Sequence, residues 1–299
     1  MAITAPTTLA GFSGFLSRQQ AGPIFDEVRR RSIIQQLAQE VQLGPSGTAI
    51  PVVTGKPVAG WVAEGAVKPA SQGTRSLVNM DPKKLATIVV VSAEVVRANP
   101  AGYMDDIRDD IAEAFANAFD AAVMWGTSTP FAAFLQQTTA AVEIGTTTQA
   151  NGGIYGDFVA ALSLLVTNDK KLTGYALGAK LEPKIQGAVD TTGRPIFVDT
   201  NPSDAVFDGT LRGRLLGRPA FLDEAADSGT NRGFAGDFTQ IAWGAIGGIS
   251  YDVSTEASVT INAALVSLWE NNLVAIRAEA EYGMVINGVS NFVEFTDAT

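Results

Sequence analysis

The sequence contains no cysteine and no histidine among its 299 residues. Without cysteine there can be no disulfide, no thiolate nucleophile and no Cys/His metal site. Without histidine the commonest general base at neutral pH is missing, which excludes Ser-His-Asp and Cys-His mechanisms. Only carboxylate or lysine chemistry remains open to an enzyme of this composition.

Charged residues and long apolar runs are also scarce. Charged residues make up 17% of the chain and hydrophobic residues 46%, whereas soluble domains carry roughly 25% charged residues. Part of the folded surface is therefore expected to be covered by another molecule. No run approaches the roughly 18 apolar residues of a membrane-spanning helix, and the first residues lack the charged start of a secretion signal. Subunit packing, not a membrane, is the expected cover.

The net charge of −10 argues against a general nucleic-acid binder. The charge is uneven, because four arginines and two acidic residues give residues 1–31 a net charge of +2. Arg29, Arg30 and Arg31 are consecutive in this segment. They form either one turn of a solvated helix or a basic arm that faces DNA or an acidic neighbour.

The first part of the chain is dominated by a long extended segment. Residues 1–23 are typical of an irregular arm, and a helix is expected over 24–41. Residues 48–84 are extended and broken by glycine and proline, which predicts a two-stranded projection with its base at 50–53 and 77–80. An isolated hairpin is marginally stable in water, so this projection needs a neighbour to lie on.

A strand and a long helix follow the projection. Residues 86–91 are mostly apolar and β-branched, which favours a strand. Asn99 and Pro100 form a helix start, apolar residues then recur every three or four positions, and Gly126 is the expected C-cap. Aspartates cluster near the helix start, where they suit the positive end of the helix dipole better than a metal site. These aspartates are Asp105, Asp106, Asp109 and Asp110.

The second half alternates short strands and helices. Asp157 is expected to cap a helix over 158–166, and a further helix is expected over 181–189. The glycine-rich string at 244–249 indicates a turn, because it lacks the spacing of a phosphate-binding loop. The C-terminal strands are expected to pair with residues 85–91 in a sheet under the long helix. Expected strands lie at 196–198, 215–222, 240–243, 273–280, 284–286 and 292–295.

Four segments together resemble one known family. Residues 60–92, with a Trp-Val-Ala-Glu-Gly tip before a β-branched strand, resemble the extended loop and following strand of the major capsid proteins of tailed bacteriophages. Residues 271–283 resemble that family's closing motif, an Asn-Leu start, an Arg-x-Glu strand and an aromatic-Gly turn. Residues 193–197 and 236–238 resemble short markers of its axial domain. No charged, helical pre-segment of the kind that serves some members as a built-in scaffold is evident.

The resemblance implies an α+β chain with the Hong Kong 97-like capsid fold. That fold has an N-terminal arm, an extended β-hairpin loop, a peripheral domain with a long spine helix, and an axial α/β domain. The implied bounds are 1–47 for the arm and first helix, 48–84 for the extended loop, 85–149 for the peripheral domain with its spine helix, 150–265 for the axial domain, and 266–299 for the return strands of the peripheral domain.

The function that this resemblance implies is structural, not enzymatic. A major capsid protein self-assembles into hexamers and pentamers of an icosahedral shell that encloses double-stranded DNA. The implied partners are further copies of the chain, a separate scaffold, a portal protein, decoration proteins and the packaged DNA through non-specific proximity. No cofactor and no membrane are implied, and the implied location is the virion, after assembly in the host cytoplasm.

Subunit contacts are expected on the projection and on the arm. Trp61, Glu64 and Lys68 are the candidates on the projection, and Arg29 to Arg31 those on the arm. The alternative for Trp61 is a place in the core of its own subunit.

Some members of the family also join a loop lysine to an asparagine of a neighbour beside a glutamate. Lys56 or Lys68 with Asn287, Asn291 and Glu294 supply the ingredients here, but non-covalent contacts are expected, because an exposed lysine stays protonated at neutral pH.

Two other classes of function stay open. An encapsulin nanocompartment shell shares the fold and encloses enzymes instead of DNA. A His-independent carboxylate hydrolase would use an acidic pair such as Asp223 with Glu224, or Asp208 with a neighbour. The long helix and the α/β middle argue against an all-β tail tube.

Overall fold

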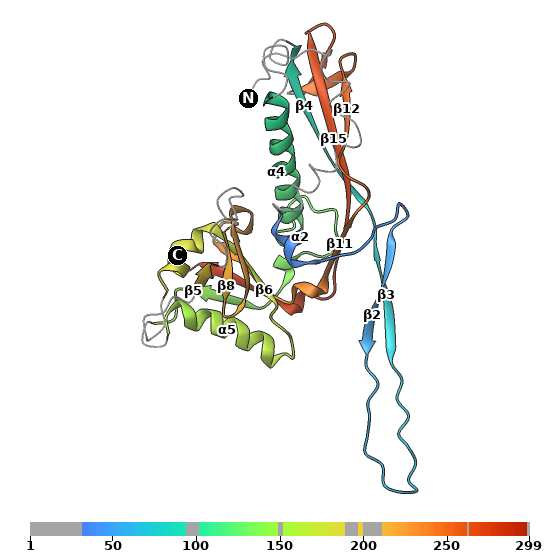
Figure 1. The fold of residues 1–299 in the computed structure, drawn as a ribbon, viewed down its shortest axis with the longest axis vertical. Helices are drawn as coiled ribbons and strands as arrows, with labels where there is room; N and C mark the ends of the chain where they lie inside the picture. Colours follow the sequence, from blue (N-terminus) through green and yellow to red (C-terminus); the bar gives the residue numbers. More distant parts are fainter. Residues whose placement is uncertain are drawn as a thin grey trace.

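The molecule has three visible parts: a long helix beside a sheet, a second sheet with its own helices, and a hairpin that projects away from both (Figure 1). The computed structural model describes residues 32–93, 102–148, 152–188, 197–199, 211–261 and 263–297. The mixture of helix and sheet agrees with the predicted α+β class. The expectations for Arg29 to Arg31, Asn99, Pro100 and Asp208 fall outside the described residues.

The first sheet joins segments from distant parts of the chain. Its strands are β1 (Gln39–Glu40), β4 (Lys83–Ser92), β11 (Ile241–Ala245), β12 (Ser250–Ser254) and β15 (Leu273–Ile286). β15 runs antiparallel to β4, from Leu273 opposite Ser92 to Tyr282 opposite Lys83. This pairing confirms the return to residues 85–91 for the strand expected at 273–280. The strand expected at 292–295 does not return there, because Phe292–Asp297 pairs with residues 231–236 and 141–144 in the second sheet.

β15 is one strand of 14 residues, not the two separate strands that were expected at 273–280 and 284–286. Gly283 does not interrupt it. A Cβ at Gly283 would lie 2.8 Å from Cγ of Met80 and 2.9 Å from Cδ2 of Leu43. The glycine therefore lets these two side chains pack directly on the strand.

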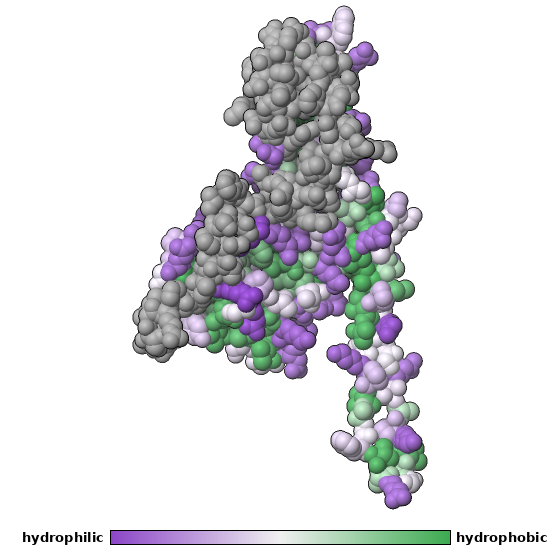
Figure 2. Space-filling view, in the orientation of Figure 1, coloured by the Kyte–Doolittle hydropathy of each residue, from purple (hydrophilic) through white to green (hydrophobic). Residues whose placement is uncertain are grey.

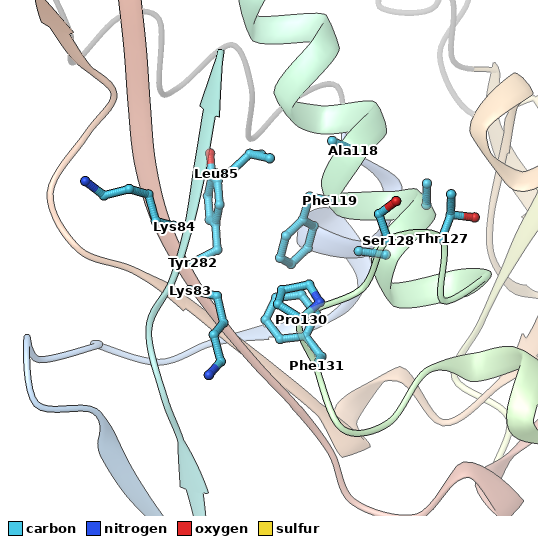
Figure 3. A pocket seen from close by; sticks show the side chains of 12 residues that line it. Lys83, Lys84, Leu85, Ala118, Phe119, Thr127, Ser128, Pro130, Phe131 and Tyr282 are labelled. Atoms are coloured by element: carbon cyan, nitrogen blue, oxygen red, sulfur yellow. The ribbon is translucent and has the colours of Figure 1, made fainter.

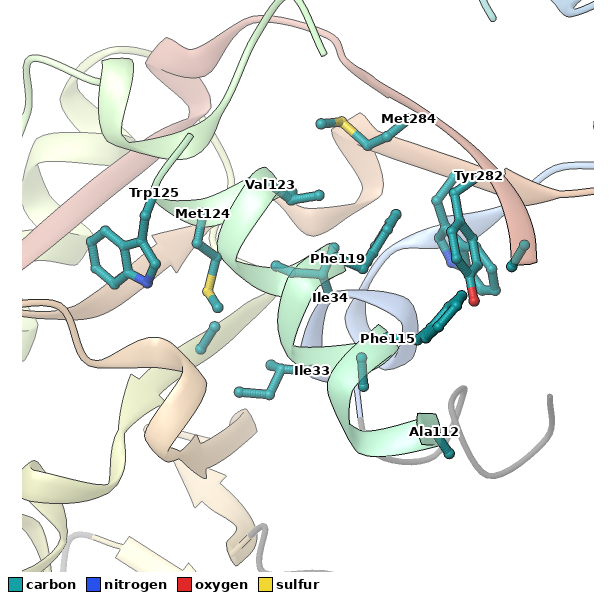
Figure 4. Packing of buried hydrophobic residues seen from close by; sticks show 14 of the residues in the cluster. Ile33, Ile34, Ala112, Phe115, Phe119, Val123, Met124, Trp125, Tyr282 and Met284 are labelled. Atoms are coloured by element: carbon teal, nitrogen blue, oxygen red, sulfur yellow. The ribbon is translucent and has the colours of Figure 1, made fainter. Parts of the chain in front are cut away.

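The long helix α4 (Gly102–Met124) covers one face of this sheet (Figure 4). Ile111, Phe115 and Phe119 are buried at helical spacing. The Phe119 ring lies 5.3 Å from that of Tyr282 and 6.3 Å from that of Trp243, which are on strands β15 and β11. Aromatic contacts of this kind hold the helix on the sheet. The helix ends before Gly126, which has a φ of 68°.

The second sheet has the order β5-β16-β10-β6-β9-β8-β7. Its strands are β5 (Ala141–Ile144), β6 (Gly174–Gly178), β7 (Phe197–Asp199), β8 (Leu211–Leu215), β9 (Arg218–Asp223), β10 (Asn231–Gly236) and β16 (Phe292–Asp297). Helix α5 (Ile154–Thr167) packs on it through Phe158, whose ring lies 5.2 Å from that of Phe295 and 5.8 Å from that of Tyr175.

Two expectations for this region are wrong. α5 begins at Ile154, so Asp157 is inside its first turn and is not its cap. The Asp157 carboxylate accepts hydrogen bonds from the Thr147 hydroxyl and from the Gly145 backbone N–H instead. The expected strand at 215–222 is a hairpin of β8 and β9, because Leu216 and Gly217 both have positive φ and turn the chain back.

The projecting hairpin consists of β2 (Thr48–Gly55), β3 (Thr74–Met80) and the loop 56–73 between them. Its antiparallel register begins with Thr48 opposite Met80. Both strands lie where the sequence places the base of the projection. In Figure 1 the hairpin extends beyond the rest of the chain, so its far end has no support from its own subunit.

The helix expected over 24–41 ends at Leu37, four residues before its expected end. Helix α2 spans Ile33–Leu37, and Gln39 and Glu40 then form β1 beside Ala242 and Trp243 of β11. Pairing with a distant strand overrides the local helical pattern here.

The remaining elements are short. They are β13 (Ser258–Ile261), β14 (Ala264–Ser267), α6 (Glu182–Gln186) and the 3₁₀ turns η2 (Leu135–Gln137), η4 (Ala179–Leu181), η5 (Glu224–Ala226), η6 (Phe238–Gln240) and η7 (Val289–Asn291). Among the described residues, no helix has the length and apolar character to cross a membrane.

Candidate subunit-contact site

The tip of the hairpin, residues 61–68, is the most exposed apolar segment of the described chain. The Trp61 side chain is fully exposed, with a relative accessibility of 106%, and Val67 reaches 94%. In Figure 2 apolar patches recur along the hairpin, separated by polar residues, and one of them lies near its far end. Trp61 therefore does not fold into the core of its own subunit, and the alternative considered for it is wrong.

The tip is shaped by a tight turn. The N–H of Ala66 donates to the carbonyl of Ala63 at 3.1 Å, and Gly65 has a φ of 78°. This pattern is that of a type II turn, which needs a glycine at its third position. Glu64 and Gly65 occupy the apex, with Trp61 and Lys68 on the two sides and both exposed.

Few hydrogen bonds join the two sides of the loop 56–73. The Ser71 hydroxyl accepts from the N–H of Val58 at 3.2 Å and donates to its carbonyl at 3.0 Å. The base, in contrast, is anchored, because Met80 is fully buried against β15. The hairpin thus combines a fixed base with a tip that makes no hydrophobic contact to its own subunit's core.

An apolar pocket of about 360 Å³ lies near the hairpin base, between the C-terminal half of α4 and strand β4 (Figure 3). We refer to it as the helix–strand pocket. Its apolar lining includes Leu85, Phe119, Pro130, Phe131 and Tyr282, and Lys83 and Lys84 lie on its strand side. Sequence reasoning missed this pocket, because its residues come from three separate segments of the chain.

Two acidic residues of the described chain, Asp223 and Asp120, have structural roles. The Asp223 carboxylate accepts from the N–H of Ala225 at 2.9 Å and caps η5, so it is not directed at a reaction partner. Asp120 is buried, and burial raises its pKa to about 7, although hydrogen bonds from Ser32 and the N–H groups of Ile33 and Ile34 oppose the shift. Within the described ranges, no three acidic residues group as a metal site would require.

Three ion pairs of the described residues reinforce the second sheet. Arg232 lies 3.2 Å from Asp297 and 3.5 Å from Asp227, and its side chain is largely buried. The pKa of Asp297 is lowered, first by the hydrogen bond from Lys184 and also by Arg232. These contacts join β10, β16 and α6, and they indicate a structural role.

Comparisons with known proteins identify the family. The model of the phage capsid family matches residues 14–294. The chain belongs to this family. The "Probable major capsid protein gp17" of Mycobacterium phage D29 is 42% identical over 290 residues, with 96% of this chain and 91% of that protein covered. The protein of the same name from Mycobacterium phage L5 is 43% identical over 300 residues, with the same coverage.

Solved structures agree on the fold. A chain from Gordonia phage Cozz superimposes on this capsid protein with a TM-score of 0.69 at 22% identity, covering 90% of this chain and 87% of that one. The Hong Kong 97-like class of fold is therefore confirmed, and so is the structural role in a phage virion. The relatives give no support to the carboxylate hydrolase or to the encapsulin alternative.

Proposed function

We propose that this capsid protein forms the pentamers and hexamers of an icosahedral shell that encloses double-stranded DNA, with the hairpin as the main contact between subunits. The observation that carries this proposal is the fully exposed Trp61 at the end of an unsupported hairpin. A two-stranded ribbon of this kind gains stability when it lies on a neighbour. The closed symmetry of a shell lets every copy both give and receive the same contact.

The parts of the chain take roles that follow from the family. Residues 48–84 serve as the extended loop, and residues 85–149 and 266–299 as the peripheral domain with α4 as its spine helix. Residues 150–265 serve as the main part of the axial domain, whose core around Phe158 and Tyr175 is separate from that under α4. The sheets depart from these bounds, because β5 and β16 lie in the axial sheet and β11 and β12 lie in the sheet under α4. Residues 1–47 contain the N-terminal arm.

The tip and the arm supply the contacts in this proposal. Trp61 provides apolar area for the centre of a contact. Glu64 and Lys68 provide charges of both signs, which suit the solvent-accessible rim of such a contact. Arg29, Arg30 and Arg31 face an acidic neighbouring subunit or the packaged DNA. A scaffold, a portal and decoration proteins complete a particle that assembles in the host cytoplasm.

Negative-stain microscopy and sedimentation of the purified protein test the proposal. Hollow shells of megadalton size are expected, because each subunit leaves its hairpin tip unpaired. A single species near the subunit mass of 31.3 kDa at micromolar concentration would contradict it. Particles recovered from infected cells should contain DNA, whereas enzyme cargo would favour an encapsulin.

A further inference from the structure

The helix–strand pocket matches the size and chemistry of an indole side chain. Its volume of about 360 Å³ is within the range of pockets that bind small organic groups. The rings of Phe119 and Tyr282 form one wall, 5.3 Å apart, and Phe131 lies 6.3 Å from Phe119. Phe119 and Tyr282 are each only 2% exposed. This wall is therefore preformed and fixed by the core behind it.

Polar groups at the pocket suit the one polar atom of tryptophan. Thr127 and Ser128 line its helix side (Figure 3), and both residues are exposed. An indole N–H usually finds a hydrogen-bond acceptor when it is buried, and a hydroxyl oxygen accepts such a bond. A purely aliphatic side chain in the pocket would offer these hydroxyls no hydrogen-bond donor.

The strand side of the pocket carries one cation that is not neutralised. Lys84 forms an ion pair with Glu279 at 3.0 Å. Among the described residues, Lys83 has no acidic partner within ion-pair distance. The side chain of Lys83 is exposed beside the pocket, as Figure 3 shows. The pocket thus offers an apolar interior with a free positive charge at its edge.

The tip of the hairpin carries the complementary pattern. Trp61 is fully exposed, and Glu64 follows it by three residues at the apex of the turn. The subunit's own tip does not reach its own pocket, because the hairpin starts beside the pocket at Met80 and extends away from it (Figure 1). Only the tip of another copy can bring Trp61 to this place.

We propose that, in the shell, Trp61 of one copy inserts into the helix–strand pocket of a neighbouring copy, with Glu64 beside Lys83 of that copy. This inference rests on the proposed function and adds the receiving surface to it. The contact joins two different surfaces of the same chain, so it is heterologous, and in a shell the rotation between neighbours closes such contacts into the rings of the capsomers. A central aromatic anchor with a charge pair at its edge is a common arrangement of strong interfaces.

Cysteine crosslinking tests the contact directly, because the natural chain contains no cysteine. The variant Ala63→Cys with Thr127→Cys places one thiol on the tip and one at the pocket, and leaves Trp61, Glu64 and Lys83 unchanged. Shells of this variant are treated with a short bismaleimide and separated on a denaturing gel. Covalent multimers are expected. The matched control is Ala63→Cys with Lys171→Cys. It should give no covalent multimers, because Lys171 lies just before β6 of the second sheet and not at the pocket.

The outcomes separate this inference from the proposed function. Shells without multimers, equal multimers in the control, or a link within one chain would overturn the inference while the shell function stands. Failure of the parent protein to form any particle would overturn the function itself. A multimer that joins two position-63 thiols, or two position-127 thiols, instead of one of each, as identified by mass spectrometry of the peptides, would also contradict the inference.

Charge exchange provides a second test. Glu64→Lys or Lys83→Glu alone should cause loss of most shells, because each places like charges together at the contact. The double variant restores opposite charges and should recover shell yield. Equal yields for the single and double variants would overturn the pairing of Glu64 with Lys83.

Discussion

The carboxylate of Asp120 on α4 accepts a hydrogen bond of 2.7 Å from the hydroxyl of Ser32, which lies 88 residues earlier in the chain. The N–H groups of Ile33 and Ile34 donate to the same carboxylate at 2.9 and 3.3 Å. Asp120 therefore satisfies the free donors at the start of α2 and ties that short helix to the long one. The point where residues 1–31 join the body of the protein is fixed by one buried acid.

The stability of the subunit should depend on pH through Asp120. Burial raises its pKa to about 7 in the folded state, against about 3.9 in an unfolded chain. The folded state then holds a proton that the unfolded state has released. The proton on Asp120 therefore stabilises the folded state. This stabilisation is complete below about pH 4 and is lost as the pH rises through about 7, and the free energy of unfolding falls by about 4 kcal/mol at most.

Urea unfolding of the parent and of Asp120→Asn between pH 4 and pH 8 checks this dependence. The stability difference between the two proteins should shrink as the pH rises toward 7, because only the parent carries a carboxyl group that releases its proton on unfolding. Asp110→Asn, an exposed position on the same helix, is the matched control. A difference that is constant over the whole range would contradict the prediction.

The core under α5 should depend strongly on Phe158. This ring is 1% exposed and contacts Tyr175 and Phe295. Phe158→Ala should lower the free energy of unfolding by about 3–5 kcal/mol, because it removes apolar contacts and leaves a cavity. The neighbouring Val159 is 38% exposed, and Val159→Ala should cost less than about 1 kcal/mol. Denaturant unfolding monitored by circular dichroism measures both, and equal losses would show that Phe158 is not a core residue.

The sequence was sufficient for the elements with a clear periodicity. Helix α4 and the hairpin lie where the apolar spacing and the glycine and proline pattern place them. Leu216 could not be foreseen as a turn residue, because leucine rarely adopts a positive φ. The early end of α2 depends on pairing with β11, which is a long-range contact.

The candidate site was only partly predictable. The sequence left open whether Trp61 is exposed or packs in the core of its own subunit, and the structure shows that it is exposed. The pocket could not be found in the sequence, because Leu85, Phe119 and Phe131 meet only through the packing of α4 on β4. Asp120 was missed for the same reason, since its partners are 86 to 88 residues away.

The tip should be needed for assembly but not for folding. Replacing residues 61–68 by a short Gly/Ser loop removes no residue of the three cores, so helical content measured by circular dichroism should stay unchanged. Sedimentation should show that shells are lost. Gly-Ser-Gly at the exposed loop 169–171 is the control and should assemble. Loss of the fold in the tip variant would mean that the tip stabilises its own subunit.

The arm should contribute a salt-sensitive contact. Changing Arg18, Arg29, Arg30 and Arg31 to Gln removes four positive charges, and the particles should then dissociate more readily than the parent at low salt. The difference should shrink at high salt, where such charges are screened within a few ångströms. Light scattering against salt concentration measures it, with Lys170→Gln and Lys171→Gln as the control. Identical curves for all three proteins would show that the arginines are only solvated.

The contacts between subunits should be non-covalent. Lys56 and Lys68 are both exposed on the hairpin, so their own subunit places neither amine in the dry pocket that formation of an isopeptide bond needs. The amide of Asn291 is buried and donates to the carbonyls of Asn287 and Gly288 at 2.7 and 2.8 Å. An incoming amine would have to break these bonds first.

The Asn287 amide is exposed but already donates to the Gln240 side chain at 2.8 Å. Burial does raise the pKa of Glu294, which suits a proton acceptor, but within the described part of the chain no lysine forms an ion pair with it. Shells boiled in denaturant should therefore run as a single band near 31.3 kDa on a gel. A ladder of multimers that disappears in Lys68→Ala or Lys56→Ala would reveal an isopeptide bond instead, formed between a hairpin lysine and an asparagine of the neighbour with loss of ammonia.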